Sequence, residues 1–295
     1  MRKVFIILFV WMLSCLAAFA QNWEGVKADS SYIWGEGWGS TIEEADQQAL
    51  SSLISKITIA VVSDFRQVEE QVLSSKGDEH YMMQSNRSSA YSSVTLSNTH
   101  RVVLKGGRKS HVGRWIHRDE LDVIFADRKS RILEYEECAL DAERAGRVDD
   151  ALRYHYWAYV LLRSLQRPSE LRSEDGRMLL NSIPESISAI LEDVNVRMTS
   201  HIGDVVKLNF TFRGRPIGRL DFTYFDGARW SSTTSVRSGL ATLDMAPGAL
   251  ADYIQLRIEY AYYGDSLMDG ELFDTMSVLN LKPIRKSYIT FRTRN

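Results

Sequence analysis

The sequence is poor in several residue types. Only 5 of its 295 residues are proline and 2 are cysteine, and Lys and Arg (36) nearly balance Asp and Glu (38). These counts exclude a proline-rich disordered chain, a collagen-like repeat and a disulfide-dense miniprotein. The formal net charge is −2, and the sequence shows no cluster of Lys and Arg of the kind that phosphate binding needs. We therefore expect no nucleic-acid partner. What is present is 44% hydrophobic residues, enough for two or three domains with cores of their own.

Residues 1–20 have the pattern of a secretory signal peptide. Two basic residues precede an unbroken apolar run from Val4 to Leu13, and the segment ends in Ala18-Phe19-Ala20, a small-x-small cleavage site. A membrane anchor needs about 20 apolar residues, a length that this segment reaches only when the cleavage region is counted. We therefore expect cleavage after Ala20 and a mature protein in the periplasm or cell envelope of a Gram-negative bacterium.

Cys15 provides an alternative route of maturation. Bacterial lipoproteins are cut just before a cysteine that receives the lipid, and Leu13-Ser14-Cys15 has part of that motif. Met12 and Leu13 depart from it, so an outer-membrane lipoprotein anchored through Cys15 is the second hypothesis. Cleavage after Ala20 leaves Cys138 as the single cysteine, which excludes an intramolecular disulfide.

Residues 22–130 are expected to form an α+β domain. Tyr32–Gly39 has the pattern of a short aromatic strand, and Ser40 with Glu43 has the spacing of a helix capping box. Apolar residues at helical spacing then predict a helix. Further along we expect a strand at Lys56–Val62, a helix near Asp64–Ser74, and strands at Tyr91–Asn98, Thr99–Lys105 and Arg114–Phe125, the last two joined as a hairpin at Gly106-Gly107.

Residues 131–195 are expected to form a helical connector. Gly146 marks a tight turn between two helices, the second of which starts at Asp149 or Asp150 and ends before Pro168. This pair resembles a single tetratricopeptide hairpin. A solenoid needs about three or more such repeats, so we expect a connector. A third helix is predicted from Ser182 to Asp193, with Pro184 in its first turn.

Residues 196–295 have the pattern of an antiparallel β domain. Apolar and polar residues alternate strictly in Val206–Phe212 and Ile254–Tyr260, and turn residues recur at Arg213-Gly214, Asp226-Gly227, Ser238-Gly239 and Tyr263-Gly264-Asp265. We predict an immunoglobulin-like β-sandwich without the Cys…Trp…Cys core of antibody domains. The final residues, Ser287–Arg294, read as a strand, which suggests a truncated member of a longer type.

Motifs for chemistry are weak in this sequence, so we expect no catalytic residues, no cofactor and no metal ligands. Gly35-x-Gly37-x-Gly39 differs from dinucleotide and Walker spacing and is better explained as a strand-to-helix turn. His111 and His117 would stand too far apart on one strand to share an ion. Cys138 fits a buried, inert thiol.

Aromatic side chains are the candidate partner-binding residues. Tyr154 and Trp157 belong to an aromatic-rich helix whose rings cannot all face one core, so some are expected at a contact with a partner or with another domain of this chain. Trp230 lies in the loop Phe225–Trp230, where it could stack on a sugar. Trp34 and Trp38 share one face of their strand and are expected in the core, whereas an exposed pair would mark a binding surface.

A family resemblance rests on three segments in order: Trp34-Gly35-Glu36-Gly37, then Glu43 to Leu50, then Ile57–Val62. Their order resembles the bacterial envelope family typified by a small, twenty-kilodalton, Lpp-type antigenic lipoprotein, and it is similar to the N-terminal domain of the flagellar protein FlgT. The resemblance covers residues 22–130 and implies an envelope module that works by association, with no catalytic residues. The architecture that follows is similar to long surface or periplasmic proteins of the Bacteroides type.

The function that these observations favour is non-enzymatic. We expect a cell-envelope protein with a scaffold or assembly role that binds envelope proteins. The first alternative is a carbohydrate-binding envelope protein that recognises surface glycans through Trp230. The second is a hydrolase whose carboxylates come together across domains, which a single sequence leaves open.

Overall fold

The computed structural model describes residues 23–72, 99–165, 168–246, 253–279 and 287–292. The signal segment with Cys15, and the strand expected at Tyr91–Asn98, lie outside these residues. The chain divides into an N-terminal unit, residues 1–126, and a C-terminal unit, residues 127–295. Both combine helices with antiparallel sheet, which confirms the mixed α+β class. Among the described residues, none of the helices has the length and apolar character needed to cross a membrane.

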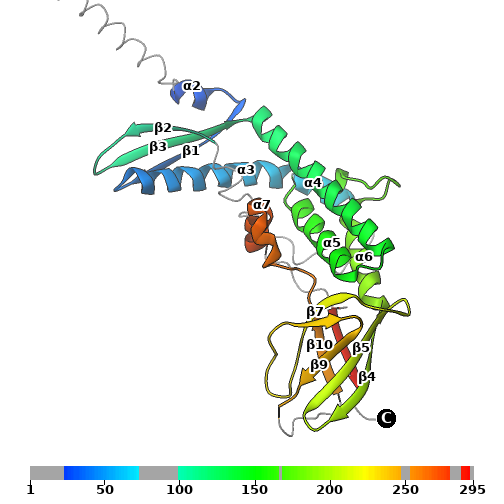
Figure 1. Cartoon of the computed structure of the whole chain (residues 1–295). Helices are drawn as coiled ribbons and strands as arrows, with labels where there is room; N and C mark the ends of the chain where they lie inside the picture. Colours follow the sequence, from blue (N-terminus) through cyan, green and yellow to red (C-terminus); the bar gives the residue numbers. More distant parts are fainter. Residues whose placement is uncertain (1–22, 73–98, 166–167, 247–252, 280–286, 293–295) are drawn as a thin grey trace, which may run out of the picture. The chain divides into compact units, whose positions relative to one another are not determined.

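The N-terminal unit is a small sheet with a helix along one face (Figure 1). Its strands β1 (Tyr32–Gly39), β3 (Ser110–His117) and β2 (His100–Lys105) lie in that order and are antiparallel. Helix α3 (Ile42–Val72) packs on β1 and β3, and the short helix α2 (Trp23–Ala28) precedes the sheet. The hairpin expected at Gly106-Gly107 is confirmed, with Gly107 at a φ of 98°.

The glycines of β1 allow α3 to approach the strand closely. A Cβ added to Gly35 would lie 2.4 Å from the carbonyl oxygen of Ala49, and one added to Gly37 would lie 2.1 Å from that of Ala45. No side chain fits at either distance, because the obstructing atoms are helix backbone. The glycine pattern therefore serves close packing of α3 along the strand, whereas the sequence analysis assigned it to the strand-to-helix turn.

The start of α3 is capped one residue later than the sequence analysis expected. The Thr41 hydroxyl accepts a 3.1 Å hydrogen bond from the amide of Glu44, and the Glu44 carboxylate accepts from both the amide and the hydroxyl of Ser40 at 2.7 Å. The Glu44 side chain thus bonds back to Ser40 and not to Thr41, so the cap is shared among three residues and differs from the expected Ser40–Glu43 capping box. These hydrogen bonds from Ser40 hold the pKa of Glu44 below its usual value.

Two element boundaries in this unit correct the sequence analysis. The strand predicted at Lys56–Val62 is part of α3, because Ile57 is fully buried on the same helical face as Leu53 and packing overrides the β preference of branched residues. The strand predicted at Arg114–Phe125 ends at His117. Beyond it, Leu121 and Phe125 are buried four residues apart, at helical spacing.

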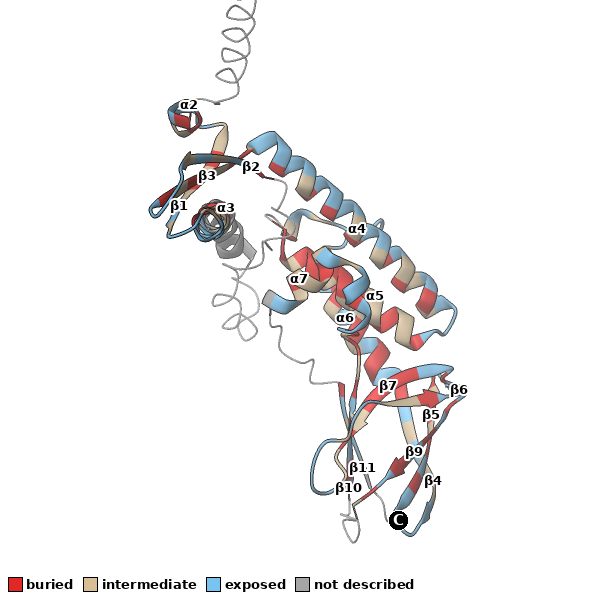
Figure 2. Ribbon diagram, turned by 60° about the vertical axis from the view of Figure 1, so that its left-hand side comes forward, coloured by how far each residue is buried: buried red, intermediate tan, exposed pale blue. Residues whose placement is uncertain are grey.

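The helices after β3 follow the expected order, and the first of them begins in the N-terminal unit and continues into the C-terminal unit. Helix α4 (Arg118–Arg144) is joined to α5 (Val148–Arg163) through Gly146, whose φ of 71° confirms the predicted tight turn. Asp149 and Asp150 lie in the first turn of α5 and do not cap it. Helix α6 (Leu179–Asp193) begins before Ser182, so Pro184 lies inside the helix. Figure 2 shows buried residues along α5 and α6, which pack on one another.

The β region forms one curled antiparallel sheet (Figure 1). An immunoglobulin-like sandwich is not confirmed. Strand pairing is continuous from β11 to β4, whereas a sandwich has two separate sheets. The rings of Phe210 and Phe222 pack in the core 5.1 Å apart. The strand order is β11 (Tyr288–Arg292), β10 (Tyr253–Ile258), β7 (Arg219–Tyr224), β8 (Thr234–Arg237), β9 (Leu240–Asp244), β5 (Val205–Phe212) and β4 (Val194–Ile202), with β6 (Arg215–Pro216) paired to β5.

The predicted turns at Arg213-Gly214 and Ser238-Gly239 are confirmed, since both residues of each pair have positive φ, as tight hairpin turns require. Tyr263-Gly264-Asp265 is different. It leads into the 3₁₀ helix η5 (Asp265–Met268) and then α7 (Gly270–Val278), which follow β10 in the chain.

Candidate binding surfaces

Trp157 packs within its own unit. Its side chain is only 8% exposed, and Nε1 donates a 2.8 Å hydrogen bond to the carbonyl oxygen of Ala261. The indole thus joins α5 to the segment between β10 and η5. The sequence analysis expected the aromatic rings of this helix to contact either a partner or another part of this chain. Trp157 contacts this chain, and its side chain is not available to a partner.

Tyr154 is half-buried beside Trp157, at a ring distance of 6.0 Å. Its ring stacks 6.0 Å from that of Tyr135 on α4, and the Arg153 guanidinium lies 4.9 Å from its ring centre. Because it is only partly covered, Tyr154 can contribute to a contact surface, and the Arg153 guanidinium beside its ring also reaches Asp265, the first residue of η5.

Ion pairs fix both ends of η5. Arg153 donates to the carboxylate of Asp265 at 3.1 Å, before the turn. After the turn, Asp269 accepts from Arg131 and, at 2.8 Å, from the Tyr135 hydroxyl. Asp269 also caps α7 by accepting from the amide of Leu272 at 3.1 Å. The turn is therefore held from both sides by α4 and α5.

A buried arginine strengthens the attachment of α7 to α4. Arg128 is 1% exposed, and its guanidinium donates to Glu271 at 2.6 Å and to the Ser164 hydroxyl at 3.0 Å. Arg131 also donates to Glu271. Charged groups taken from water must be paired and hydrogen-bonded in this way, so α7 has one fixed position on these helices.

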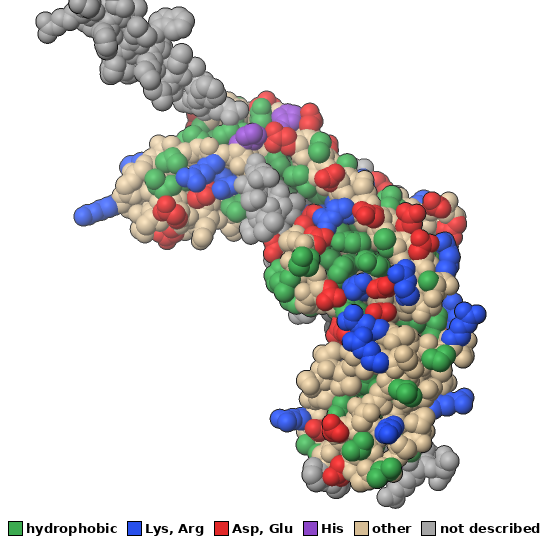
Figure 3. Space-filling view, viewed as in Figure 1, with side chains coloured by type: hydrophobic (Ala, Val, Ile, Leu, Met, Phe, Trp, Pro, Cys, Tyr) green, Lys and Arg blue, Asp and Glu red, His purple; other side chains and the backbone are tan. Residues whose placement is uncertain are grey.

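The fixed turn exposes apolar side chains. Leu267 is 63% exposed and Met268 is 94% exposed. Ser266, which precedes them, is fully buried, and its hydroxyl donates a 2.7 Å hydrogen bond to the carbonyl oxygen of Tyr263. The Tyr263 ring is also exposed. In Figure 3, hydrophobic side chains gather over the α5 and α7 region beside charged ones. We name Tyr154, Tyr263, Leu267 and Met268 the η5 surface.

A second exposed group surrounds Trp230. Its ring is 38% exposed and lies 6.0 Å from Phe225 and 6.3 Å from Tyr288, which is 45% exposed. The Arg257 guanidinium lies 5.5 Å from the Trp230 ring centre. In the strand register Arg257 stands between Tyr288 and Thr223, so these three side chains share one face of the sheet. We name Thr223, Phe225, Trp230, Arg257 and Tyr288 the Trp230 surface.

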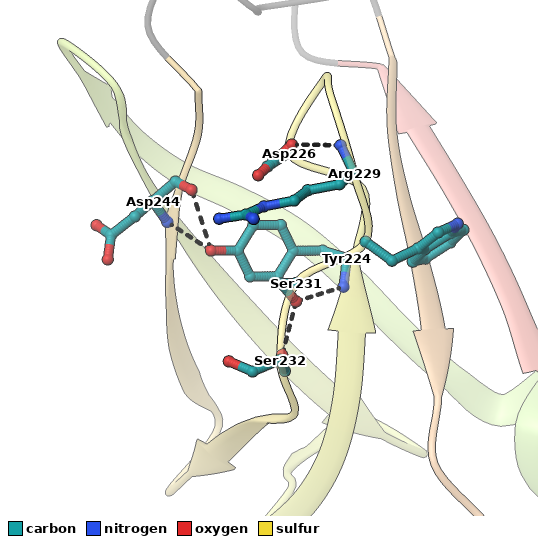
Figure 4. A pocket seen from close by; sticks show the side chains of 7 residues that line it. Tyr224, Asp226, Arg229, Ser231, Ser232 and Asp244 are labelled. Carbon is teal, nitrogen blue, oxygen red and sulfur yellow. Dashed lines mark hydrogen bonds between the residues drawn. The ribbon is translucent and has the colours of Figure 1, made fainter.

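A pocket of about 470 Å³ adjoins Trp230 and the loop before it (Figure 4). The Tyr224 hydroxyl is held by the backbone of Asp244, accepting from its amide at 2.9 Å and donating to its carbonyl at 3.1 Å. Asp226 accepts from the amides of Ala228 and Arg229, both at 2.8 Å, and these hydrogen bonds lower the pKa of its carboxyl group. The loop is therefore ordered by its own side chains.

The histidines and the cysteine considered in the sequence analysis have structural surroundings. The His111 ring stacks 4.6 Å from the ring of Trp38. Trp38 was expected in the core, but it is 56% exposed. Trp34 is half-buried beside Trp23. Burial and nearby carboxylates raise the pKa of the Cys138 thiol. Among the described residues, no group of three or more histidines, cysteines and carboxylates is placed to hold a metal ion.

Two carboxylates meet where α5 faces the sheet. Arg219 lies between them, with Nε 3.8 Å from Asp149 and Nη2 3.4 Å from Asp221. Burial raises the pKa of Asp149, and Asp221 also accepts from the Ser235 hydroxyl at 2.5 Å. An arginine shared by two acids, at a junction of a helix and a strand, fits a structural ion bridge.

Comparison with known proteins assigns no family. No protein-family model matches the chain, and no curated protein matches it. The secreted protein HP1454 from the human pathogen Helicobacter pylori, a solved structure, is similar over 37% of this chain and 40% of that chain, with 17% sequence identity and a TM-score of 0.27. The match spans less than half of that protein, and such a low TM-score carries no argument about fold or function.

Proposed function

We propose that this chain is a non-catalytic binding protein that contacts a protein partner of the bacterial cell envelope through the η5 surface. The observation that carries the proposal is the exposure of Leu267 and Met268 on a turn that Arg153 and Arg131 hold at both ends. A turn fixed before binding loses little conformational entropy when a partner covers it. Solvent-exposed apolar side chains in a fixed position are therefore suited to recognition.

The composition of the surface supports a protein as the partner. Tyrosine, methionine and arginine are enriched where proteins meet, and hot spots combine a few apolar anchors with surrounding polar groups. Met268 is a flexible apolar anchor, Tyr154 and Tyr263 are amphipathic rings, and Arg153 is already neutralised by Asp150 and Asp265. A partner with an apolar pocket would bury the two exposed side chains without leaving a charge unpaired.

The envelope location and the family rest on the sequence. The pattern of residues 1–20 supports export, and the ordered motifs in residues 22–130 support an envelope module of the Lpp-type lipoprotein family. Fractionation of native cells with the wild-type chain and with Cys15→Ala tests this part. We expect a soluble envelope protein that starts at Gln21 in both cases. Lipid on Cys15, with membrane attachment lost in Cys15→Ala, would establish the lipoprotein alternative.

Native electrophoresis of the tagged protein from its own cells tests the binding function. We expect a complex larger than the chain alone, and we expect the double variant Leu267→Ser, Met268→Ser to lose it while remaining folded. Leu240→Ser, which changes an exposed residue of β9 in the same unit, is the matched control and should keep the complex. Turnover of a substrate abolished by substitution of Cys138, His111 or His117 would contradict the non-catalytic assignment.

A further inference from the structure

The Trp230 surface is built differently from the η5 surface. Aromatic rings from a loop and from the edge strand, those of Trp230 and Tyr288, lie side by side and are both partly open to solvent. The Trp230 ring is held by Phe225 on one side and by Arg257 on another, so its orientation is fixed. The apolar C–H face of a pyranose ring packs on an open aromatic face of this kind, because the ring offers flat apolar area together with a polar edge.

An unpaired positive charge lies against Trp230. Arg257 forms no ion pair with any acidic side chain among the described residues, unlike Arg153, Arg213 and Arg219, whereas Arg229 lies beside Asp226, whose pKa its backbone amide and its charge both lower. A guanidinium offers a fork of donors that matches a carboxylate or sulfate in two hydrogen bonds. A ligand that stacks on Trp230 is therefore favoured when it carries a negative group within reach of Arg257.

Hydroxyl-binding groups lie close to the same loop. Asp226 has one oxygen engaged by the amides of Ala228 and Arg229, and the side chain of Ser232 also lines the pocket. Figure 4 shows Asp226 and Ser232 on opposite sides of the Tyr224 ring. The pocket volume of about 470 Å³ lies within the range of about 300–1,000 Å³ found for small-molecule sites.

From the exposed aromatic rings, the unpaired Arg257 guanidinium and the adjoining polar pocket, we infer that the Trp230 surface binds an acidic saccharide, one whose pyranose ring stacks on Trp230 and whose anionic group pairs with Arg257. Single-stranded nucleic acid also combines rings with negative charge. It fits less well, because Asp226 would face its phosphates and the chain as a whole has a net charge of −2. The inference does not depend on the η5 surface, so either can fail without the other.

A glycan array that contains uronic-acid, sialylated and sulfated oligosaccharides, neutral oligosaccharides and a single-stranded DNA oligonucleotide tests the inference on the full mature chain. We expect binding to at least one acidic glycan. Trp230→Ala and Arg257→Gln should each weaken that binding by roughly tenfold or more, as loss of a charge-assisted contact or of a stacked ring implies. Leu240→Ala is the matched control and should bind as the wild type does, and circular dichroism should show all variants folded.

Four outcomes would overturn the inference. One is an array on which no acidic glycan is retained. Another is binding that is unchanged in folded Trp230→Ala. The third is equal binding of neutral glycans with no effect of Arg257→Gln. The fourth is preferential retention of the DNA oligonucleotide. None of these results bears on complex formation through Leu267 and Met268.

Discussion

The indole nitrogen of Trp157 donates a hydrogen bond to the backbone carbonyl of Ala261, 104 residues further along the chain. This contact joins the middle of α5 to the segment that leads from the sheet into η5. It places the start of η5 on the helices, and the ion pairs of Asp265 and Asp269 complete the attachment. The exposed side chains at Leu267 and Met268 are consequently part of a rigid element.

Replacing Trp157 should destabilise the C-terminal unit. Trp157→Phe keeps a ring but leaves the Ala261 carbonyl without its donor, which we expect to cost about 1–3 kcal/mol of unfolding free energy. Urea denaturation followed by circular dichroism measures the change. Trp230→Phe, at a partly exposed ring, is the control and should stay within about 0.5 kcal/mol of wild type. Equal stability of the two variants would show that Trp157 has no structural role.

The close approach of α3 to β1 predicts a sharp difference between two glycines. Gly37→Ala forces a Cβ against the backbone of Ala45, so we expect the N-terminal unit to lose about 1–3 kcal/mol or more through overpacking. At Gly106 the nearest atom to an added Cβ is 4.0 Å away, so Gly106→Ala should be nearly neutral. Thermal unfolding of both variants measures the difference. A Gly37→Ala protein as stable as wild type would contradict the observed packing.

Arg128 should control the attachment of α7. Arg128→Leu removes charge-assisted hydrogen bonds to Glu271 and Ser164, and Arg131 still pairs with Glu271, so we expect a loss of about 1.5–3 kcal/mol. Hydrogen exchange in Gly270–Val278 should become faster at the same time. Arg144→Ala, which removes an exposed ion pair with Asp141, is the control and should change neither quantity appreciably.

The thiol of Cys138 should react slowly. Burial, followed by the charges of Glu134, Glu137 and Asp141, raises its pKa, so the native protein holds less thiolate at a given pH than an unfolded chain does. Iodoacetamide labelling of the Cys138 peptide, measured by mass spectrometry, should be slower in the native protein than in urea. The native rate should rise only at more alkaline pH. A native rate equal to the unfolded rate would rule out the protected thiol.

The sequence predicted those features whose causes are local. Positive-φ turns at Gly146, Ser238-Gly239 and Arg213-Gly214 follow from residue type, and the alternation in β5 and β10 follows from one buried face. The extent of α3 was not predictable. The β-branched residues around Ile57 favour a strand, but Ile57 is buried in a helix that packs on the sheet, and this packing decides the structure.

The candidate surfaces were predicted only in part. Tyr154 and Trp230 were identified as exposed or half-exposed aromatics, but Leu267 and Met268 were missed because Tyr263-Gly264-Asp265 has the composition of a hairpin turn. Their fixed position depends on the contact of Arg131 with Asp269, which are 138 residues apart. Local sequence holds no signal for a contact at that separation. Arg257 and Tyr288 become neighbours only through strand pairing.

The most direct test of the proposed function is site-specific photo-crosslinking in native cells. A photoreactive amino acid at position 268, the most exposed apolar residue of the η5 surface, should yield a discrete crosslinked protein. The same amino acid at position 240 on β9 should not, and Tyr154→Ala should reduce the yield at position 268. A position 268 that gives no adduct, or only the adducts also obtained at position 240, would contradict the account that this surface binds an envelope protein.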